Sequence, residues 1–122
     1  LGCASANKII SENKRIPLVG TGSDSGVFKD TGLTIDYSYN LAGDKITLTG
    51  NAHYRGRISS LSVYFLFLDA TGKRIDKKLV AYSGFRSMDM MSDHAIDKTM
   101  VVPPGATGFS FSFYTQEYNG RE

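Results

Sequence analysis

The stretch that decides the fold is residues 61–68, which reads Leu-Ser-Val-Tyr-Phe-Leu-Phe-Leu. In a strand, alternate side chains point to opposite faces, so Phe65 and Phe67 would share one face and Leu66 and Leu68 the other. A strand that is apolar on both faces belongs in the middle of a sheet, with something covering its second side. We therefore expect 61–68 to be a central strand.

Two further stretches alternate strictly between apolar and polar residues. Residues 33–41 read Leu-Thr-Ile-Asp-Tyr-Ser-Tyr-Asn-Leu, and residues 109–113 place three phenylalanines on one face. The first stretch should form an antiparallel hairpin with 46–54, in which Gly50 marks a bulge or a close approach of backbones. The phenylalanine stripe should fill much of the core.

The remaining segments are expected at edges or in loops. Lys77 and Lys78 indicate that 75–82 is an edge strand, since lysines protect an edge against aggregation. Pro17 cannot donate a ladder hydrogen bond, so 16–19 is predicted to be an edge strand or a strap. Residues 20–26 are glycine-rich and predict a loop, and 83–95 is the longest irregular stretch before a strand at 96–102.

These elements predict an all-β fold, an immunoglobulin- or fibronectin-III-like antiparallel sandwich of two sheets and about seven strands. A small barrel is the alternative. The length of 122 residues suits one domain. We expect residues 1–14 to be an N-terminal tether and 15–122 to be the sandwich.

Composition excludes several classes of function. The net charge of +2 is small and dispersed along the chain, whereas nucleic-acid binding needs a clustered basic stripe. No apolar run is long enough to form a membrane-spanning helix.

The single cysteine, Cys3, lies in the sequence Leu1-Gly2-Cys3-Ala4. This sequence resembles the end of the lipobox, where bacterial lipoprotein precursors are cleaved before the cysteine after its thiol has received a diacylglycerol. The resemblance implies lipidation of Cys3 and an address in the bacterial cell envelope, on the periplasmic side or at the cell surface. Residues 1–14 would then be a lipid-proximal tether. The alternative is an N-terminal cysteine with no such role.

A second resemblance covers about a third of the chain. Residues 46–51 (Ile-Thr-Leu-Thr-Gly-Asn) precede the apolar strand 61–68, which leads into Asp69-Ala-Thr-Gly72-Lys73, and Pro103-Pro104-Gly105 precedes the phenylalanine stripe. This order resembles the FxLYD-type sandwich domains of bacterial exported proteins and lipoproteins. The resemblance implies a fold and an envelope location, and it implies no activity.

An enzymatic function is the least favoured of the three classes considered. No G-x-S-x-G motif occurs, and the two histidines, His53 and His94, lie in a predicted strand and a predicted loop. We expect His53 on the solvent face of its strand, no catalytic residues and no cofactor.

Residues 83–97 hold the densest group of chemically active side chains. Met88, Met90, Met91 and His94 offer thioethers and an imidazole, which suit Cu(I). Asp89, Asp93 and Asp97, together with the same histidine, could instead hold a harder divalent ion. The structural alternative is that the methionines fill one end of the sandwich.

The leading hypothesis is a non-enzymatic envelope domain that acts as a protein-binding or scaffold module. Its expected partner is another envelope protein, and a homodimer formed by sheet-edge pairing is the alternative. The runner-up is metal or small-ligand binding by 83–97. Tyr37, Tyr39 and Tyr54 share the apolar phase of their strands and should be buried. Tyr64 and Tyr114 have the opposite phase from the phenylalanine stripe, so they are the candidate partner surface.

Overall fold

A computed structural model describes residues 9–18, 22–56, 58–83 and 91–117. These residues form a short 3₁₀ helix and eight strands, which run in the following order. They are η2 (Glu12–Lys14), β1 (Ile16–Pro17), β2 (Gly22–Asp30), β3 (Leu33–Ala42), β4 (Lys45–Arg55), β5 (Ile58–Leu68), β6 (Arg74–Ser83), β7 (Met91–Val101) and β8 (Gly108–Glu117).

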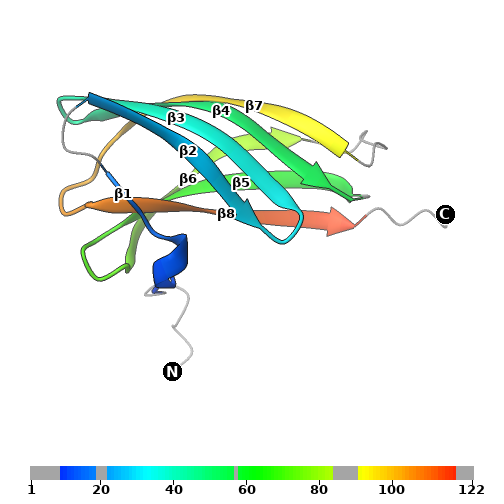
Figure 1. The fold of residues 1–122 in the computed structure, drawn as a ribbon, viewed down its shortest axis with the longest axis horizontal. Helices are drawn as coiled ribbons and strands as arrows, with labels where there is room; N and C mark the ends of the chain where they lie inside the picture. Colours follow the sequence, from blue (N-terminus) through cyan, green and yellow to red (C-terminus); the bar gives the residue numbers. More distant parts are fainter. Residues whose placement is uncertain (1–8, 19–21, 57, 84–90, 118–122) are drawn as a thin grey trace.

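The strands form two four-stranded antiparallel sheets, one in the order β1-β8-β5-β6 and the other in the order β2-β3-β4-β7 (Figure 1). The predicted two-sheet sandwich is therefore confirmed, and the barrel alternative is wrong. β5 is an inner strand and β6 an edge strand, as the lysine pattern predicted. The hairpin of β3 and β4 has the expected pairing, with Leu33 opposite Tyr54.

The core lies between the sheets and is rich in aromatic rings. Phe109 of β8 stacks on Phe65 of β5, with ring centroids 4.7 Å apart, and meets Tyr39 edge-on at 5.4 Å. Tyr37 and Tyr39 are buried, as the alternation predicted, and Tyr54 packs against the core. Burial, together with the nearby Asp24 carboxylate, raises the pKa of Tyr37.

Gly50 marks a close approach of backbones within the β3–β4 pair. A Cβ at this position would collide with the carbonyl oxygen of Asp36 on β3, and the Gly50 φ angle is +153°. Only glycine fits such a position without displacing the neighbouring strand.

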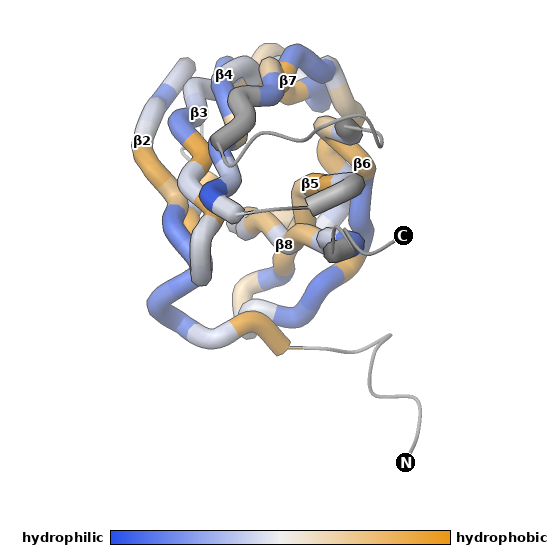
Figure 2. The backbone as a smooth tube through the Cα atoms, turned by 90° about the vertical axis from the view of Figure 1, so that its right-hand side faces the viewer, coloured by the Kyte–Doolittle hydropathy of each residue, from blue (hydrophilic) through white to orange (hydrophobic). Residues whose placement is uncertain are grey.

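The segment before β1 lies across the outer face of the β1-β8-β5-β6 sheet (Figure 2). We call residues 9–15 the strap. The Ile10 N–H donates to the Gly72 carbonyl at 2.9 Å, Ile9 forms a bridge with Lys73, and the Arg15 Nε donates back to the Ile10 carbonyl at 2.7 Å. Residues 9–14, which the sequence placed in the tether, thus contact the sandwich.

Two loop predictions are wrong where the structure describes them. Residues 22–26 belong to β2, which pairs with β3 along its whole length, and residues 91–95 belong to β7, which pairs with β4. Both are edge strands. Among the side chains whose burial the structure describes, only Ile96 and Met100 are buried in residues 94–101 of β7, and only Phe28 is buried in residues 23–30 of β2. Neither stretch therefore carries the full alternation on which the prediction depended.

Candidate functional site

The outer face of the β8-β5-β6 layer is ordered in rows, because the register fixes which side chains lie beside one another. Three successive rows cross this face from β8 through β5 to β6. They are Ser110-Leu66-Lys77, Ser112-Tyr64-Leu79 and Tyr114-Ser62-Tyr82. In the first row Ser110 and Leu66 are buried beneath the strap and Lys77 is exposed, and the other two rows extend beyond the strap.

The rows beyond the strap expose aromatic and apolar side chains. Tyr114 is 61% exposed, Tyr82 is 62% exposed and Leu79 is 46% exposed, while Tyr64 is half-buried. We call these four residues the tyrosine face. The outward phase predicted for Tyr64 and Tyr114 is confirmed, whereas their role as a partner surface stays a prediction.

Tyr82 also belongs to this face, which the alternation in the sequence does not predict. Val63 pairs with Ala81 and Tyr64 pairs with Leu79, so the register slips by one residue at Val80. This bulge turns both Val80 and Ala81 toward the core and sends Tyr82 outward. Strict alternation from Val80 would have placed Tyr82 inside.

Beside the tyrosine face, a pocket of about 540 Å³ lies between the strap and residues 110–113 of β8. We call it the strap pocket. Leu66, Arg74 and Lys77 of β5 and β6 also line it. Leu66 is only 3% exposed although it points away from the main core, because the strap covers it.

The Ser110 hydroxyl is the unusual group in the strap pocket. Ser110 is 1% exposed, and its Oγ has no hydrogen-bond partner among the described residues. A buried hydroxyl without a partner is costly, and native proteins contain few of them.

Positive charge predominates around the strap pocket. Three cationic side chains line it, Lys14, Arg74 and Lys77, against one carboxylate, Asp30. The Lys14 ammonium lies 3.6 Å from Asp30, and the Lys77 ammonium lies 4.5 Å from the centre of the Tyr64 ring. Lys77 therefore connects the pocket to the tyrosine face through a cation–π contact.

The β5–β6 turn holds the strap in place. The Asp69 carboxylate accepts hydrogen bonds from the Thr71 hydroxyl and from the Thr71 and Lys73 N–H groups at 2.7–3.0 Å. These bonds, led by that from the hydroxyl, lower the pKa of Asp69. The ordered turn presents the Gly72 carbonyl that Ile10 uses.

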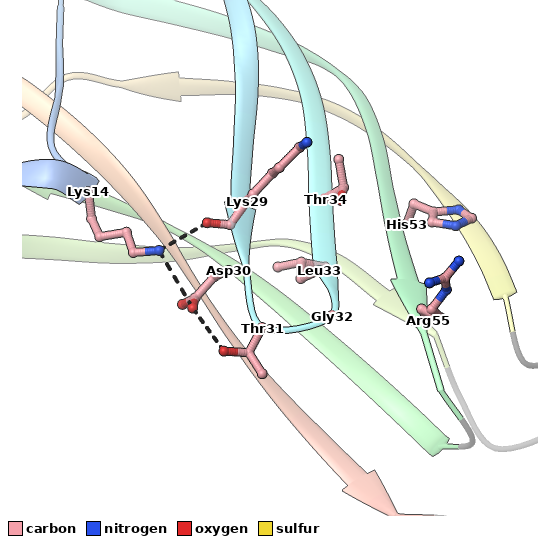
Figure 3. Close-up of a pocket in the computed structure, with 9 residues that line it drawn as sticks. All are labelled: Lys14, Lys29, Asp30, Thr31, Gly32, Leu33, Thr34, His53 and Arg55. Atoms are coloured by element: carbon pink, nitrogen blue, oxygen red, sulfur yellow. Dashed lines mark hydrogen bonds and ion pairs between the residues drawn. The ribbon is translucent and has the colours of Figure 1, made fainter.

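A second hollow, of about 640 Å³, lies at the β2–β3 hairpin (Figure 3). Lys29 of β2 and His53 and Arg55 of β4 line it, and Lys14 reaches it from the strap, donating to the Lys29 carbonyl at 3.0 Å. His53 is half-buried on the outward side of β4, as predicted. We call this the basic hollow. The bond from Lys14 fastens the strap to β2.

The predicted metal site receives no support from the described residues. Met88 and Met90 lie outside them, as do Asp89 and Cys3. Met91 and His94 are on β7, where His94 is opposite Ala52 of β4. Within the described ranges, no group of three His, Cys, Asp or Glu side chains could hold a metal ion. Metal binding by this region stays a prediction.

Among the residues that the structure describes, no helix has the length and hydrophobicity of a membrane-spanning segment. Comparison with protein-family models, with curated proteins and with solved structures found no significant match. The lipobox and FxLYD-type resemblances therefore stay predictions.

Proposed function

We propose that this chain is a non-catalytic, lipid-anchored domain of the bacterial cell envelope that binds another envelope protein through the tyrosine face. The observation that carries the proposal is the row Tyr114-Ser62-Tyr82, in which a small residue separates two tyrosines that are each more than 60% exposed. Tyrosine offers a large amphipathic surface with few rotatable bonds, and it is enriched at protein interfaces.

The opposite outer face gives a useful contrast. There the outward residues of β3 and β4 are mainly short and polar, including Ser38, Asn40 and Thr49. Single exposed apolar residues such as Val27 and Val101 do occur on that sheet, and scattered residues of this kind need no explanation. Among the residues that the structure describes, only the tyrosine face places two exposed aromatic side chains in one cross-strand row.

Site-specific photocrosslinking in the native cell envelope tests this function. We expect a photoreactive phenylalanine analogue at Tyr82 or Tyr114 to give one common crosslinked protein, and the same analogue at Val101 to give none. The double variant Tyr82→Ser/Tyr114→Ser should bind the purified crosslinked protein at least tenfold more weakly, while Val101→Ser leaves its affinity unchanged. Equal affinity of the two variants would overturn the proposal.

The lipid anchor is tested separately on the precursor. Cells grown with labelled palmitate should incorporate the label into the wild-type protein and not into the Cys3→Ala variant. Absence of label from the wild-type protein would contradict the anchor and leave the binding function standing.

A further inference from the structure

We infer that the strap pocket binds an acidic side chain carried by an extended, largely apolar segment of the partner protein. This inference rests on the proposed function, because the pocket and the tyrosine face are neighbours on one sheet and would be filled by the same partner.

The first support is the Ser110 hydroxyl. Ser110 lines the strap pocket, and its buried Oγ has no partner among the described residues. An ionised carboxylate is an acceptor-only group, so it can accept the one hydrogen bond that this hydroxyl is able to donate. Hydrogen bonds to a charged partner are shorter and about twice as strong as those between neutral groups.

The second support is the charge of the pocket. Lys77 of β6 and Ser110 of β8 lie in the same cross-strand row, on either side of Leu66 of β5. Arg74 lies in the neighbouring row, where it pairs with Leu68. The one carboxylate in the lining, Asp30, already has Lys14 as its ion-pair partner. A carboxylate bound in this pocket would therefore be surrounded by a lining in which cationic side chains outnumber carboxylates, which favours its charged form.

The third support is the apolar part of the lining. Ile9 and Ile10 of the strap and Leu66 of β5 give the pocket hydrophobic walls around this polar group. Apolar walls contribute buried area to a binding site, while placed polar groups fix the orientation of the ligand. An acidic residue flanked by leucine-like residues matches this arrangement.

The fourth support is the spacing between the pocket and the tyrosine face. Ser110 and Tyr114 are four residues apart on β8, which is roughly 13 Å at about 3.3 Å per residue. An extended segment of about four residues has the same length. One such segment can therefore place its acidic side chain in the strap pocket while its other residues pack against the tyrosines.

The inference is tested with two tetrapeptide probes that differ in one group, acetyl-Glu-Leu-Leu-Leu-amide and acetyl-Gln-Leu-Leu-Leu-amide. In NMR titrations of the whole chain, the glutamate probe should bind about tenfold more tightly and shift the amides of Leu66 and Ser110. Its advantage should fall with added salt, because the cations at the rim are partly exposed.

Three variants then assign the effect. Ser110→Ala should reduce the preference for glutamate from about tenfold to threefold or less, and Lys77→Gln should reduce it as well. Lys98→Gln, which removes an exposed lysine of β7 on the other sheet, should leave the preference unchanged. Equal binding of the two probes, or shifts centred on the basic hollow, would overturn the inference.

Failure of this inference can be distinguished from failure of the proposed function. If the tyrosine variants lose the crosslinked protein but neither probe is preferred, the binding function stands and the carboxylate site is wrong. If the glutamate probe is preferred but the tyrosine variants bind that protein normally, the site stands and the tyrosine face is wrong.

Discussion

The covered and open halves of one sheet face differ although β8, β5 and β6 contribute to both. In the covered half Leu66 and Ser110 are almost completely buried because the strap lies over them. In the open half Tyr82 and Tyr114 are mostly exposed. The chain therefore covers one half of this face with its own N-terminal strap and leaves the other half exposed. We place the proposed binding surface on the exposed half for this reason.

The largest expected effect comes from the matched pair Leu66→Ala and Leu79→Ala. Leu66 is buried beneath the strap, so its truncation should cost about 2–5 kcal/mol of unfolding free energy. Leu79 is 46% exposed, so the same change should cost less than about 1 kcal/mol. Equilibrium denaturation with urea measures both values. Similar losses at the two sites would contradict the distinction between a covered and an open half.

The attachment of the strap is tested at Gly72. Gly72 has φ +88°, and a Cβ there would collide with the Arg15 guanidinium. Gly105 has a similar φ of +90° but open space around it. Gly105→Ala should therefore cost about 1 kcal/mol from backbone strain alone, and Gly72→Ala about 1–3 kcal/mol.

Hydrogen exchange separates the contribution of the strap from that of the backbone. The Ile10 amide, which donates to the Gly72 carbonyl, should lose protection in Gly72→Ala and keep it in Gly105→Ala. Equal losses of stability with an unchanged Ile10 amide would show that the strap does not depend on this turn.

Ser110→Ala should change stability in the opposite direction. Removing a buried hydroxyl that has no partner should raise the unfolding free energy by about 1 kcal/mol. The control is Ser112→Ala, which should leave the unfolding free energy nearly unchanged. Ser112 is half-buried and lies in the next row, opposite Tyr64. A destabilised Ser110→Ala protein would mean that the hydroxyl is already satisfied, and the carboxylate inference would lose its first support.

The smallest expected effect is the pH dependence that Asp69 contributes. Its folded-state pKa is lowered by the hydrogen bonds of the turn. Its contribution to stability is therefore complete above the ordinary carboxyl pKa of about 3.9 and is lost as pH falls through the lowered value. Thermal denaturation should show wild type more stable than Asp69→Asn at pH 7 and the gap closing near pH 2. A gap of constant size would contradict this assignment.

Much of the framework could be predicted because burial on one face imposes a period of two on the sequence. The central position of β5, the edge position of β6 and the burial of Tyr37 and Tyr39 all follow from that period. The full extents of β2 and β7 could not be predicted in this way. As edge strands they are held mainly by backbone pairing, which places few demands on side-chain type.

For the candidate site, the outward position of Tyr114 follows from the sequence alone, since this residue has the opposite phase from the buried Phe109 and Phe111. The outward position of Tyr82 depends on the folded sheet, because one extra residue at Val80 reverses the alternation along β6. The burial of Ser110 beneath the strap depends on the folded structure in the same way. Neither a bulge nor a cover by a distant segment leaves a periodic signal, because both depend on contacts between residues far apart in the chain.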